Sequence, residues 1–262
     1  MSGSRIETWT GTAVESPGLA PGVILAGRYQ ILARQGEGGN GRVYLARDRR
    51  LSTFSAVKVA EKARPPAVEA LERERDLLKR LRHPGIPRAL DYLEEPDAFC
   101  LVMDLAEGRH PHQIPKQERP EGFLESCLLG LCGILAYLEA QDPPLIHGDI
   151  KPDHLFWDRQ GRLTLVDFGS AFLQGQPYHG QGTPGFAAPE QYPEEPGEPG
   201  IASDIYGLGA TLRSLMEDQP HSFFWTYIIW KCMRRDPAKR WKGAASLQKF
   251  FWNTHAFHKK KL

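Results

Sequence analysis

Two β-prone runs, residues 29–32 and 43–46, flank a short segment in which glycine recurs. The segment reads GEGGNG, and Val43 follows it within the second run. Three of its glycines follow a GxGxxG pattern: Gly36, Gly38 and Gly41. Strand-prone residues on both sides of a glycine-rich turn predict a β-hairpin, whereas a dinucleotide-binding fold would lead from these glycines into a helix. The sequence therefore predicts a glycine-rich hairpin whose tip can approach phosphate oxygens closely.

The next predicted helix carries a carboxylate on its apolar face. The helix starts at the prolines 65–66 and extends to about Arg82, and one stripe of its surface contains Leu71, Leu78 and Leu81. Glu74 fills the remaining place in this stripe. An unpaired carboxylate is expensive to bury, so a cation should meet it. Lys58, in the preceding strand-like segment SAVKVA, is the candidate.

Two acidic residues follow short apolar runs in the second half of the chain. Asp149 lies in HGDIKP and Asp167 in VDFG, eighteen positions later. Either one alone is more simply explained as a turn cap. Phosphoryl transfer needs one carboxylate near the acceptor hydroxyl and another on the metal that bridges the phosphates. Together, on turns joined by a short hairpin, the two residues favour phosphoryl-transfer chemistry.

Composition restricts the class of protein only broadly. Thirty-three Lys and Arg against thirty-two Asp and Glu give a formal net charge of +1, so we expect no nucleic-acid partner. The apolar run 127–138 is too short to span a bilayer, and we expect no transmembrane anchor and no signal peptide. The four cysteines form no CxxC pair, which favours reduced thiols, a packing role and a cytoplasmic location.

The order of these motifs resembles that of a eukaryotic-like (Hanks-type) serine/threonine protein kinase of the small bacterial type. The glycine-rich loop, AVK, Glu74, HGDIKPDH, DFG and GTPGFAAPE follow one another in that family's order, over roughly residues 28–252. The resemblance implies an α+β, bilobal fold with ATP and metal between the lobes. The expected parts are a flexible leader (1–27), a β-rich N-lobe with one major helix (28–103), a mainly helical C-lobe (104–252) and a basic tail (253–262).

The resemblance also implies roles for the residues at the matching positions. Lys58, oriented by Glu74, would bind the α- and β-phosphates of ATP, and Asp167 would hold Mg²⁺ or Mn²⁺. Asp149 would accept the proton of a protein hydroxyl. The remaining catalytic positions would be filled by Lys151, which steadies the γ-phosphate, and Thr183, which packs near the catalytic Asp.

Further positions would bind adenine or support the site. Adenine would lie between Val43, Ala56 and Phe156, with Met103 as gatekeeper and the backbone of Asp104 and Ala106 as the hinge. Glu190 would pair with Arg240, and Asp204 would anchor the catalytic loop. An internal column of side chains would couple the lobes through Leu78, Ala89, His147 and Phe168.

Three positions depart from the family pattern. Gly148 stands where the family has an arginine, and only 36 positions separate Asp204 from Arg240, which implies loss of most of the helix and loops that commonly dock protein substrates. His154 stands where an asparagine binds the second metal. Two interpretations of His154 remain open: it faces the metal, or it turns away and hydrogen-bonds the catalytic loop.

Two other functions compete with a serine/threonine kinase that phosphorylates a protein substrate. Gly148 and His154 would suit a pseudokinase scaffold, although Lys58, Glu74 and the two aspartates are all retained. The HGD triplet also resembles small-molecule phosphotransferases of the aminoglycoside type. The GTPGFAAPE segment, a polypeptide-binding feature, argues against that second alternative.

Overall fold

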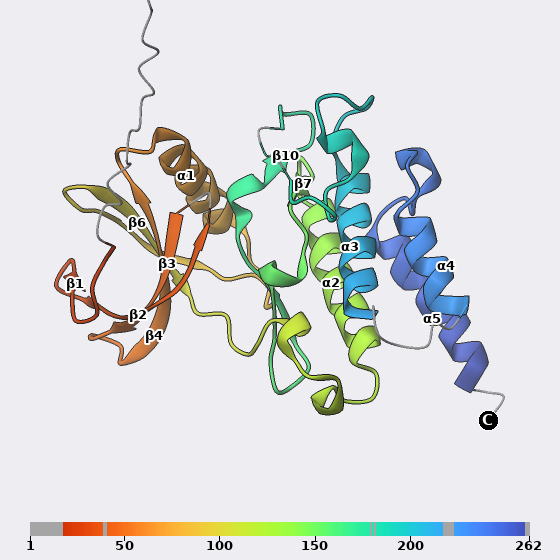
Figure 1. Ribbon diagram of the computed structural model, residues 1–262, viewed down its shortest axis with the longest axis horizontal. Coiled ribbons are helices and arrows are strands. Elements are labelled where there is room, and N and C mark those ends of the chain that lie inside the picture. The colour runs from red at the N-terminus through yellow and green to blue at the C-terminus, as the bar shows by residue number, and fades with distance from the viewer. Residues whose placement is uncertain (1–17, 39–40, 179, 181, 217–222, 260–262) are drawn as a thin grey trace, which may run out of the picture.

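A computed structural model describes residues 18–38, 41–178, 180, 182–216 and 223–259, with side chains as far as Thr254 (Figure 1). The structure has two lobes. A β-sheet and one helix form the first lobe, and the second is mainly helical, as predicted for an α+β bilobal kinase fold. No helix within the described ranges is both long and apolar enough to cross a membrane.

The N-lobe is built on a six-stranded antiparallel sheet in the order β1-β2-β3-β4-β6-β5. A single long helix, α1 (Pro65–Arg80), buries Leu71, Glu74 and Leu78 and ends close to the predicted residue 82. The strands are β1 (Ile24–Leu25), β2 (Tyr29–Gly38), β3 (Gly41–Asp48), β4 (Thr53–Glu61), β5 (Ala89–Glu94) and β6 (Ala98–Asp104).

The predicted glycine-rich hairpin is formed by β2 and β3. Gly36 pairs with Val43 and Gly38 with Gly41. Gly41 has φ 120°, and a Cβ there would lie 2.2 Å from the carbonyl oxygen of Val59. Only glycine allows β3 to start so close to β4. The backbone contact therefore requires glycine at position 41, whether or not a bound ligand also requires it.

The boundary predicted for the leader is wrong within the described residues. β1 adds a short edge to the sheet through Ile24 and Leu25, and the Leu25 side chain is buried. Leu19 donates its backbone N–H to the Tyr44 hydroxyl at 3.1 Å. A two-residue strand is too short to show alternation in a sequence, which is why composition alone assigned it to a flexible segment. Residues 1–17 lie outside the described part.

The described part of the C-lobe contains four helices with short strands and turns between them. The helices are α2 (Phe123–Glu139), α3 (Ile201–Met216), α4 (Phe223–Cys232) and α5 (Ala244–Lys259). Two small hairpins pair β7 (Leu145–Ile146) with β10 (Phe172–Leu173) and β8 (Leu155–Trp157) with β9 (Leu163–Leu165). The 3₁₀ turns are η1 (Pro111–Gln113), η2 (Lys116–Glu118), η3 (Pro152–His154), η4 (Phe168–Ser170), η5 (Pro189–Gln191) and η6 (Pro237–Lys239).

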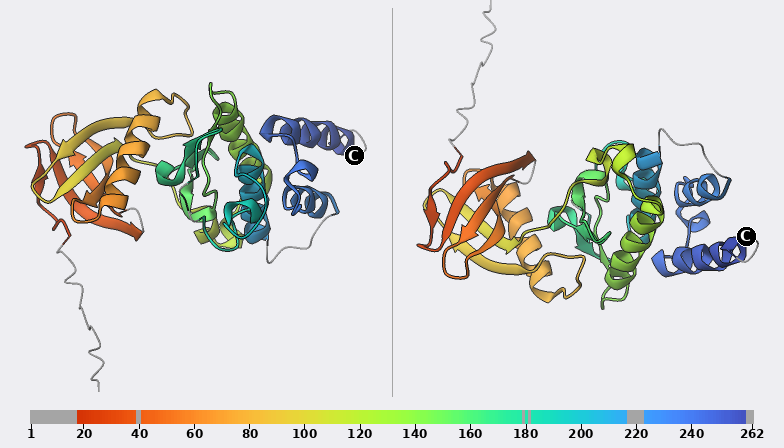
Figure 2. Two further views of the ribbon diagram at one scale, coloured as in Figure 1. Left: turned by 90° about the horizontal axis from the view of Figure 1, so that it is seen from above. Right: turned by 90° about the horizontal axis from the view of Figure 1, so that it is seen from below.

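The last two helices lie at the end of the molecule that is farthest from the sheet (Figure 2). The backbone of α5 continues to Lys259, so the C-lobe does not end at residue 252 as predicted, and most of the predicted tail is helical. Between α3 and α4, residues 217–222 lie outside the described residues. The segment in which the sequence predicts the shortening, between Met216 and Phe224, therefore lies largely outside the described part.

One apolar core joins the two lobes. It includes Leu78 of α1, Met103 of β6 and Phe168 of η4, together with most of the buried face of α2. All four cysteines are buried as free thiols, in agreement with the packing role predicted for them. The core therefore connects the helix of the small lobe directly to the turn that follows Val166, where the predicted metal ligand lies.

Candidate active site

Lys58 lies between two carboxylates that come from different lobes. Its Nζ is 2.5 Å from Glu74 Oε2 and 2.7 Å from Asp167 Oδ1. The other oxygen of Glu74 accepts the backbone N–H of Phe168 at 3.0 Å. β4 supplies the lysine, α1 the glutamate and the turn before η4 the aspartate. The contact predicted for Lys58 and Glu74 is thus present, and Asp167 completes it.

Burial and the neighbouring charges have opposite effects on the pKa values of Lys58 and Asp167. Burial lowers the pKa of Lys58, but the charges of Asp167 and Glu74 outweigh burial and raise it above its usual value. Burial likewise raises the pKa of Asp167, and the neighbouring Lys58 charge reverses the shift, so its pKa lies well below the usual range. The group therefore contains an ammonium and an ionised aspartate at neutral pH, which is the charge distribution that phosphate and metal binding require.

Asp149, Lys151 and Thr183 form a second, closed set of contacts. Thr183 donates its hydroxyl to Asp149 Oδ1 at 2.7 Å, and Lys151 Nζ lies 2.9 Å from Asp149 Oδ2. Lys151 also donates to Thr183 Oγ1 at 2.7 Å. Burial raises the pKa of Asp149, but nearby positive charge and these hydrogen bonds bring it below its usual value. Asp149 is therefore an ionised carboxylate with both oxygens oriented.

Asp204 holds the catalytic loop from α3. Its two carboxylate oxygens accept the backbone N–H groups of His147 at 2.7 Å and Gly148 at 2.9 Å. These two contacts are the ones expected if Asp204 has the anchoring role predicted for it. Burial raises its pKa to about 7, against the opposing effect of the two N–H donors. The loop that carries Asp149 is thus fixed to the helix behind it.

His154, at the position predicted for the second metal, has a different neighbour at each ring nitrogen. His154 Nδ1 lies 2.9 Å from the carbonyl oxygen of Asp149, so this nitrogen carries the proton and donates it. Nε2 then has a free lone pair, and it lies 3.5 Å from Asp167 Oδ2. Burial lowers the pKa of His154, which keeps the ring neutral at pH 7. His154 therefore binds the loop through one nitrogen and faces the Asp167 carboxylate with the other.

The residues predicted around adenine lie on β3, β4 and β6 of the N-lobe, in the segment after β6, and on β8 of the C-lobe. Ala56 on β4 pairs with Met103 on β6, which in turn pairs with Ala89 on β5. Val43 on β3 pairs with Lys58. Asp104, the last residue of β6, is fixed by Arg88, whose guanidinium lies 2.7 Å from its carboxylate. Ala106 follows two residues later, and Phe156 lies on β8, where its ring is 4.3 Å from that of His110.

The supporting contacts predicted in the C-lobe and between the lobes are also present. Arg240 forms a two-pronged contact with Glu190 at 2.5 and 2.8 Å, and both side chains are buried. His147 is fully buried with its ring 4.8 Å from that of Phe168, while Leu78 is also inaccessible. Ala89 is only partly buried, so the fourth place of the predicted column is the weakest one.

Sequence reasoning did not assign a role to Gln191. Its Nε2 donates to the carbonyl oxygen of Gly148 at 2.7 Å, one residue before Asp149, the predicted catalytic carboxylate. The same nitrogen donates to the Tyr178 hydroxyl at 2.8 Å. The one sequence signal for such a role is that a glutamine directly follows Glu190 in a chain that lacks the usual arginine at position 148.

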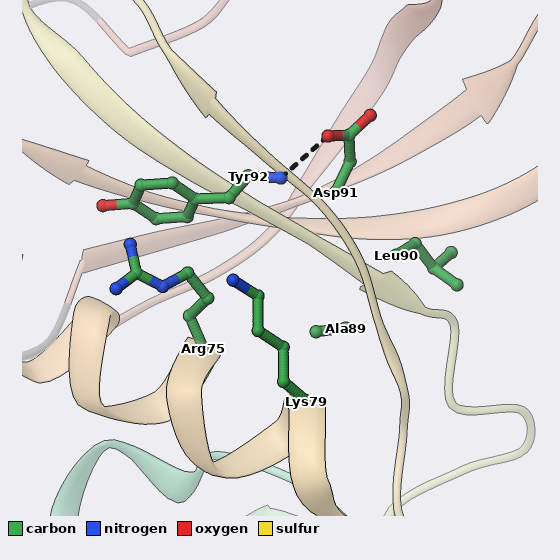
Figure 3. Close-up of a pocket in the computed structure, with 6 residues that line it drawn as sticks. All are labelled: Arg75, Lys79, Ala89, Leu90, Asp91 and Tyr92. Atoms are coloured by element: carbon green, nitrogen blue, oxygen red, sulfur yellow. Dashed lines mark hydrogen bonds between the residues drawn. The ribbon is translucent and has the colours of Figure 1, made fainter.

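A separate surface hollow lies between α1 and β5 (Figure 3). Its lining consists of Arg75, Lys79, Ala89, Leu90, Asp91 and Tyr92. The Arg75 guanidinium stands over the Tyr92 ring, 4.5 Å from its centre. The predicted catalytic residues do not line this hollow, so it is distinct from the candidate active site.

Comparison with known proteins agrees with this geometry. A family model for the protein kinase domain matches residues 29–227. The chain is 33% identical over 204 residues to the DNA damage-responsive serine/threonine-protein kinase RqkA of Deinococcus radiodurans, which covers 74% of this chain and 30% of that protein. It is 34% identical over 218 residues to serine/threonine-protein kinase B of Synechocystis, covering 73% of this chain and 37% of that protein.

A third relative is serine/threonine-protein kinase pkn2 of Myxococcus xanthus, 32% identical over 207 residues, or 73% of this chain and 24% of that protein. The chain thus spans 24–37% of the length of these relatives. The family match itself extends over most of the chain, and all three bacterial relatives are serine/threonine kinases. The chain therefore belongs to the protein kinase family and is of the Hanks type found in bacteria.

Proposed function

We propose that this chain is an ATP-dependent serine/threonine protein kinase that transfers the γ-phosphoryl group to a protein hydroxyl. The observation that carries the proposal is the arrangement of Asp149, Lys151 and Thr183. Asp149 is an oriented, ionised carboxylate, and Lys151 stands beside it as a charge for the γ-phosphate. Thr183 joins this pair to the GTPGFAAPE segment, which the family uses to bind polypeptide, so a protein substrate is favoured.

The proposed reaction needs little covalent chemistry from the protein. The acceptor hydroxyl gives its proton to Asp149 while its oxygen bonds to the γ-phosphorus and the bond to the β-phosphate oxygen breaks. Lys58, oriented by Glu74, positions the α- and β-phosphates. Adenine lies between Val43, Ala56 and Phe156 beside Met103, with the backbone of Asp104 and Ala106 as hydrogen-bonding partners.

A divalent cation, Mg²⁺ or Mn²⁺, is the second requirement. Asp167 and His154 are its proposed protein ligands. Their facing atoms are 3.5 Å apart, and two donors that share one cation at about 2.1 Å each can be at most about 4.2 Å apart, so the pair fits. A lone pair and a carboxylate that face each other gain little unless a cation lies between them. No described set of three or more His, Cys, Asp or Glu side chains is placed for a metal, so phosphate and water must supply further ligands.

The proposed function is tested by label transfer from γ-labelled ATP to a generic protein substrate. Wild type should transfer label, and Asp149→Asn should reduce the rate about 100-fold or more. Asp153→Asn is the matched control, because Asp153 is an exposed carboxylate of the same loop and should leave the rate unchanged. ATP binding without transfer in any protein would favour a scaffold, and label found only in small hydroxyl compounds would favour the other phosphotransferase class.

A further inference from the structure

Both polar groups of the Gly148 backbone are held by side chains from distant parts of the C-lobe. Its N–H donates to Asp204 Oδ1, as described above, at 2.9 Å. Its carbonyl oxygen accepts from Gln191 Nε2 at 2.7 Å and from the Tyr178 hydroxyl at 3.3 Å. This carbonyl belongs to the peptide group that leads into Asp149. Fixing it fixes the direction from which the catalytic carboxylate enters the site.

The Gln191 amide has only one orientation that satisfies its neighbours. Its Oε1 accepts the backbone N–H of Ala188 at 2.8 Å, so Nε2 must face Gly148 and Tyr178. The two hydrogens of Nε2 are donated to two oxygen acceptors, the Gly148 carbonyl and the Tyr178 hydroxyl. The Tyr178 hydroxyl donates its own hydrogen to the same Gly148 carbonyl. Three hydrogen bonds therefore close a ring among Gln191, Tyr178 and Gly148, and Gln191 is only 7% exposed.

The Tyr178 ring stands where a side chain at position 148 would have to begin. A Cβ on Gly148 would lie 3.1 Å from Tyr178 Cε2 and 3.0 Å from the carbonyl oxygen of Ser170. Tyr178 also packs on Phe172, with ring centres 5.1 Å apart. The family arginine would occupy this position and bind a phosphate on the activation segment. Here the segment itself, through Tyr178, contacts the catalytic loop.

We propose that Gln191 and Tyr178 form a clamp that positions the catalytic loop and replaces the usual contact between an arginine and a phosphate. Both are positioning residues, since they act on Asp149 through the Gly148 carbonyl. The expected effect of the clamp on the reaction rate rests on the proposed kinase function. Its expected effect on the order of the loop does not. Because its hydrogen bonds are between neutral groups, the clamp forms without any modification of the chain.

The test uses Gln191→Met, which keeps the side-chain length without donors, and Tyr178→Phe, which keeps the ring. Gln176→Met is the matched control, since Gln176 is an exposed glutamine of the same segment. Each clamp variant should lower kcat about tenfold, while the ATP affinity measured by titration stays within about twofold. The double variant should lose little more than the more severe single variant, because the two residues act as one unit. The clamp would be overturned if Gln191→Met had the same kcat as wild type, or if weaker ATP binding explained the whole loss of activity.

A second readout does not depend on turnover. Hydrogen exchange of the backbone amides in residues 145–151 should be at least about tenfold faster in both clamp variants than in wild type or Gln176→Met. If wild type transfers no label, the proposed function fails, yet faster exchange would still support the clamp. Unchanged exchange in both clamp variants would overturn it whatever the wild-type activity is.

Discussion

Lys58 Nζ and Glu74 Oε2 lie 2.5 Å apart, and the glutamate simultaneously accepts the Phe168 N–H from the other lobe. One buried carboxylate therefore joins β4, α1 and the turn that carries Asp167. The side chains of Glu74 and Lys58 are 1% and 5% exposed, so water screens the contact very little. The position of α1 relative to the large lobe and the position of Lys58, the proposed phosphate-binding lysine, depend on the same group.

Replacing Glu74 with glutamine should lower kcat, because Lys58 then has only Asp167 to hold it and is pulled toward the metal ligand. Lys58→Met leaves Glu74 buried without its cation and should destabilise the fold by about 3–5 kcal/mol. Denaturant unfolding and steady-state rates measure the two effects. Glu69→Gln is the control, since Glu69 is exposed on the same helix and should change neither quantity. Normal turnover in Glu74→Gln would mean that another group orients Lys58.

Activity should not depend on phosphorylation of the activation segment. Gly148 offers no charged group to bind a phosphate, and between Ala171 and Gly182 the sequence contains no Ser or Thr. The only hydroxyl in that interval belongs to Tyr178, which is already engaged with Gly148 and Gln191. Protein treated with a broad-specificity phosphatase should retain its rate to within about twofold. A large drop that is restored by preincubation with ATP would refute the prediction.

Restoring the family arginine with Gly148→Arg should damage the enzyme. Gly148 has φ 77°, and its Cβ position meets Ser170 and Tyr178. A side chain there costs about 1–3 kcal/mol of backbone strain and displaces the Tyr178 ring. Gly148→Ala introduces the strained Cβ without a charge, so it measures the effect of strain alone. Both variants should lower the melting temperature and the rate. An increase in rate for Gly148→Arg would show that the missing arginine, rather than the clamp, limits the enzyme.

The buried pair Glu190 and Arg240 should dominate the stability of the C-lobe. Arg240 also donates to the carbonyl oxygens of Ala202, Arg234 and Arg235. Arg240→Met leaves Glu190 without its cation and should cost about 3–5 kcal/mol in the free energy of unfolding. Arg235→Met is the matched control, because the Arg235 contact with Glu195 is 77% exposed on the arginine side and should be worth at most about 1 kcal/mol. Equal losses in the two variants would contradict the prediction.

The sequence predicts the fold well, and it predicts several contacts of the candidate site, because each motif couples a local pattern to a chemical requirement. Glu74 could be paired with Lys58 since a carboxylate on an apolar helix face needs a cation, and the hairpin glycines could be placed from their flanking strands. β1 could not be predicted, because two residues carry no periodicity. The helical backbone of 253–259 was missed because a basic, aromatic run fits a tail as well as a helix.

The role of Gln191 was missed for a different reason. Its contacts with Gly148 and Tyr178 join positions 43 and 13 residues apart, and no local pattern reports such a meeting. The same holds for His154. The sequence could name its two alternatives, but only the structure could assign its two nitrogens to different partners.

The last prediction concerns the choice of metal. Mg²⁺ is a hard cation that prefers oxygen ligands and gives up water reluctantly, whereas Mn²⁺ accepts an imidazole nitrogen more readily. Because His154 Nε2 faces Asp167 Oδ2 at 3.5 Å, it should weaken Mg²⁺ binding at the site that it is proposed to share with Asp167. Turnover should therefore be slow with Mg²⁺ and relatively faster with Mn²⁺. His154→Asn restores an oxygen ligand, so it should raise the Mg²⁺-supported rate and reduce the Mn²⁺ preference. His112→Asn is the control, since His112 is a partly exposed histidine near the same loop.

The pH dependence has a defined sign. Only the neutral ring can bind metal, and burial lowers the pKa of His154, so the wild-type rate should hold through the ordinary imidazole range and fall at a pH below it. Stability changes in the same direction, since the unfolded chain takes up a proton at a higher pH than the folded one does. His154→Asn should lose the part of the rate profile that comes from imidazole, while direct titration of Mn²⁺ into the nucleotide complex should show weaker binding than in wild type. An unchanged ratio of Mg²⁺ to Mn²⁺ rates in His154→Asn would show that the ring serves only to hold the Asp149 carbonyl.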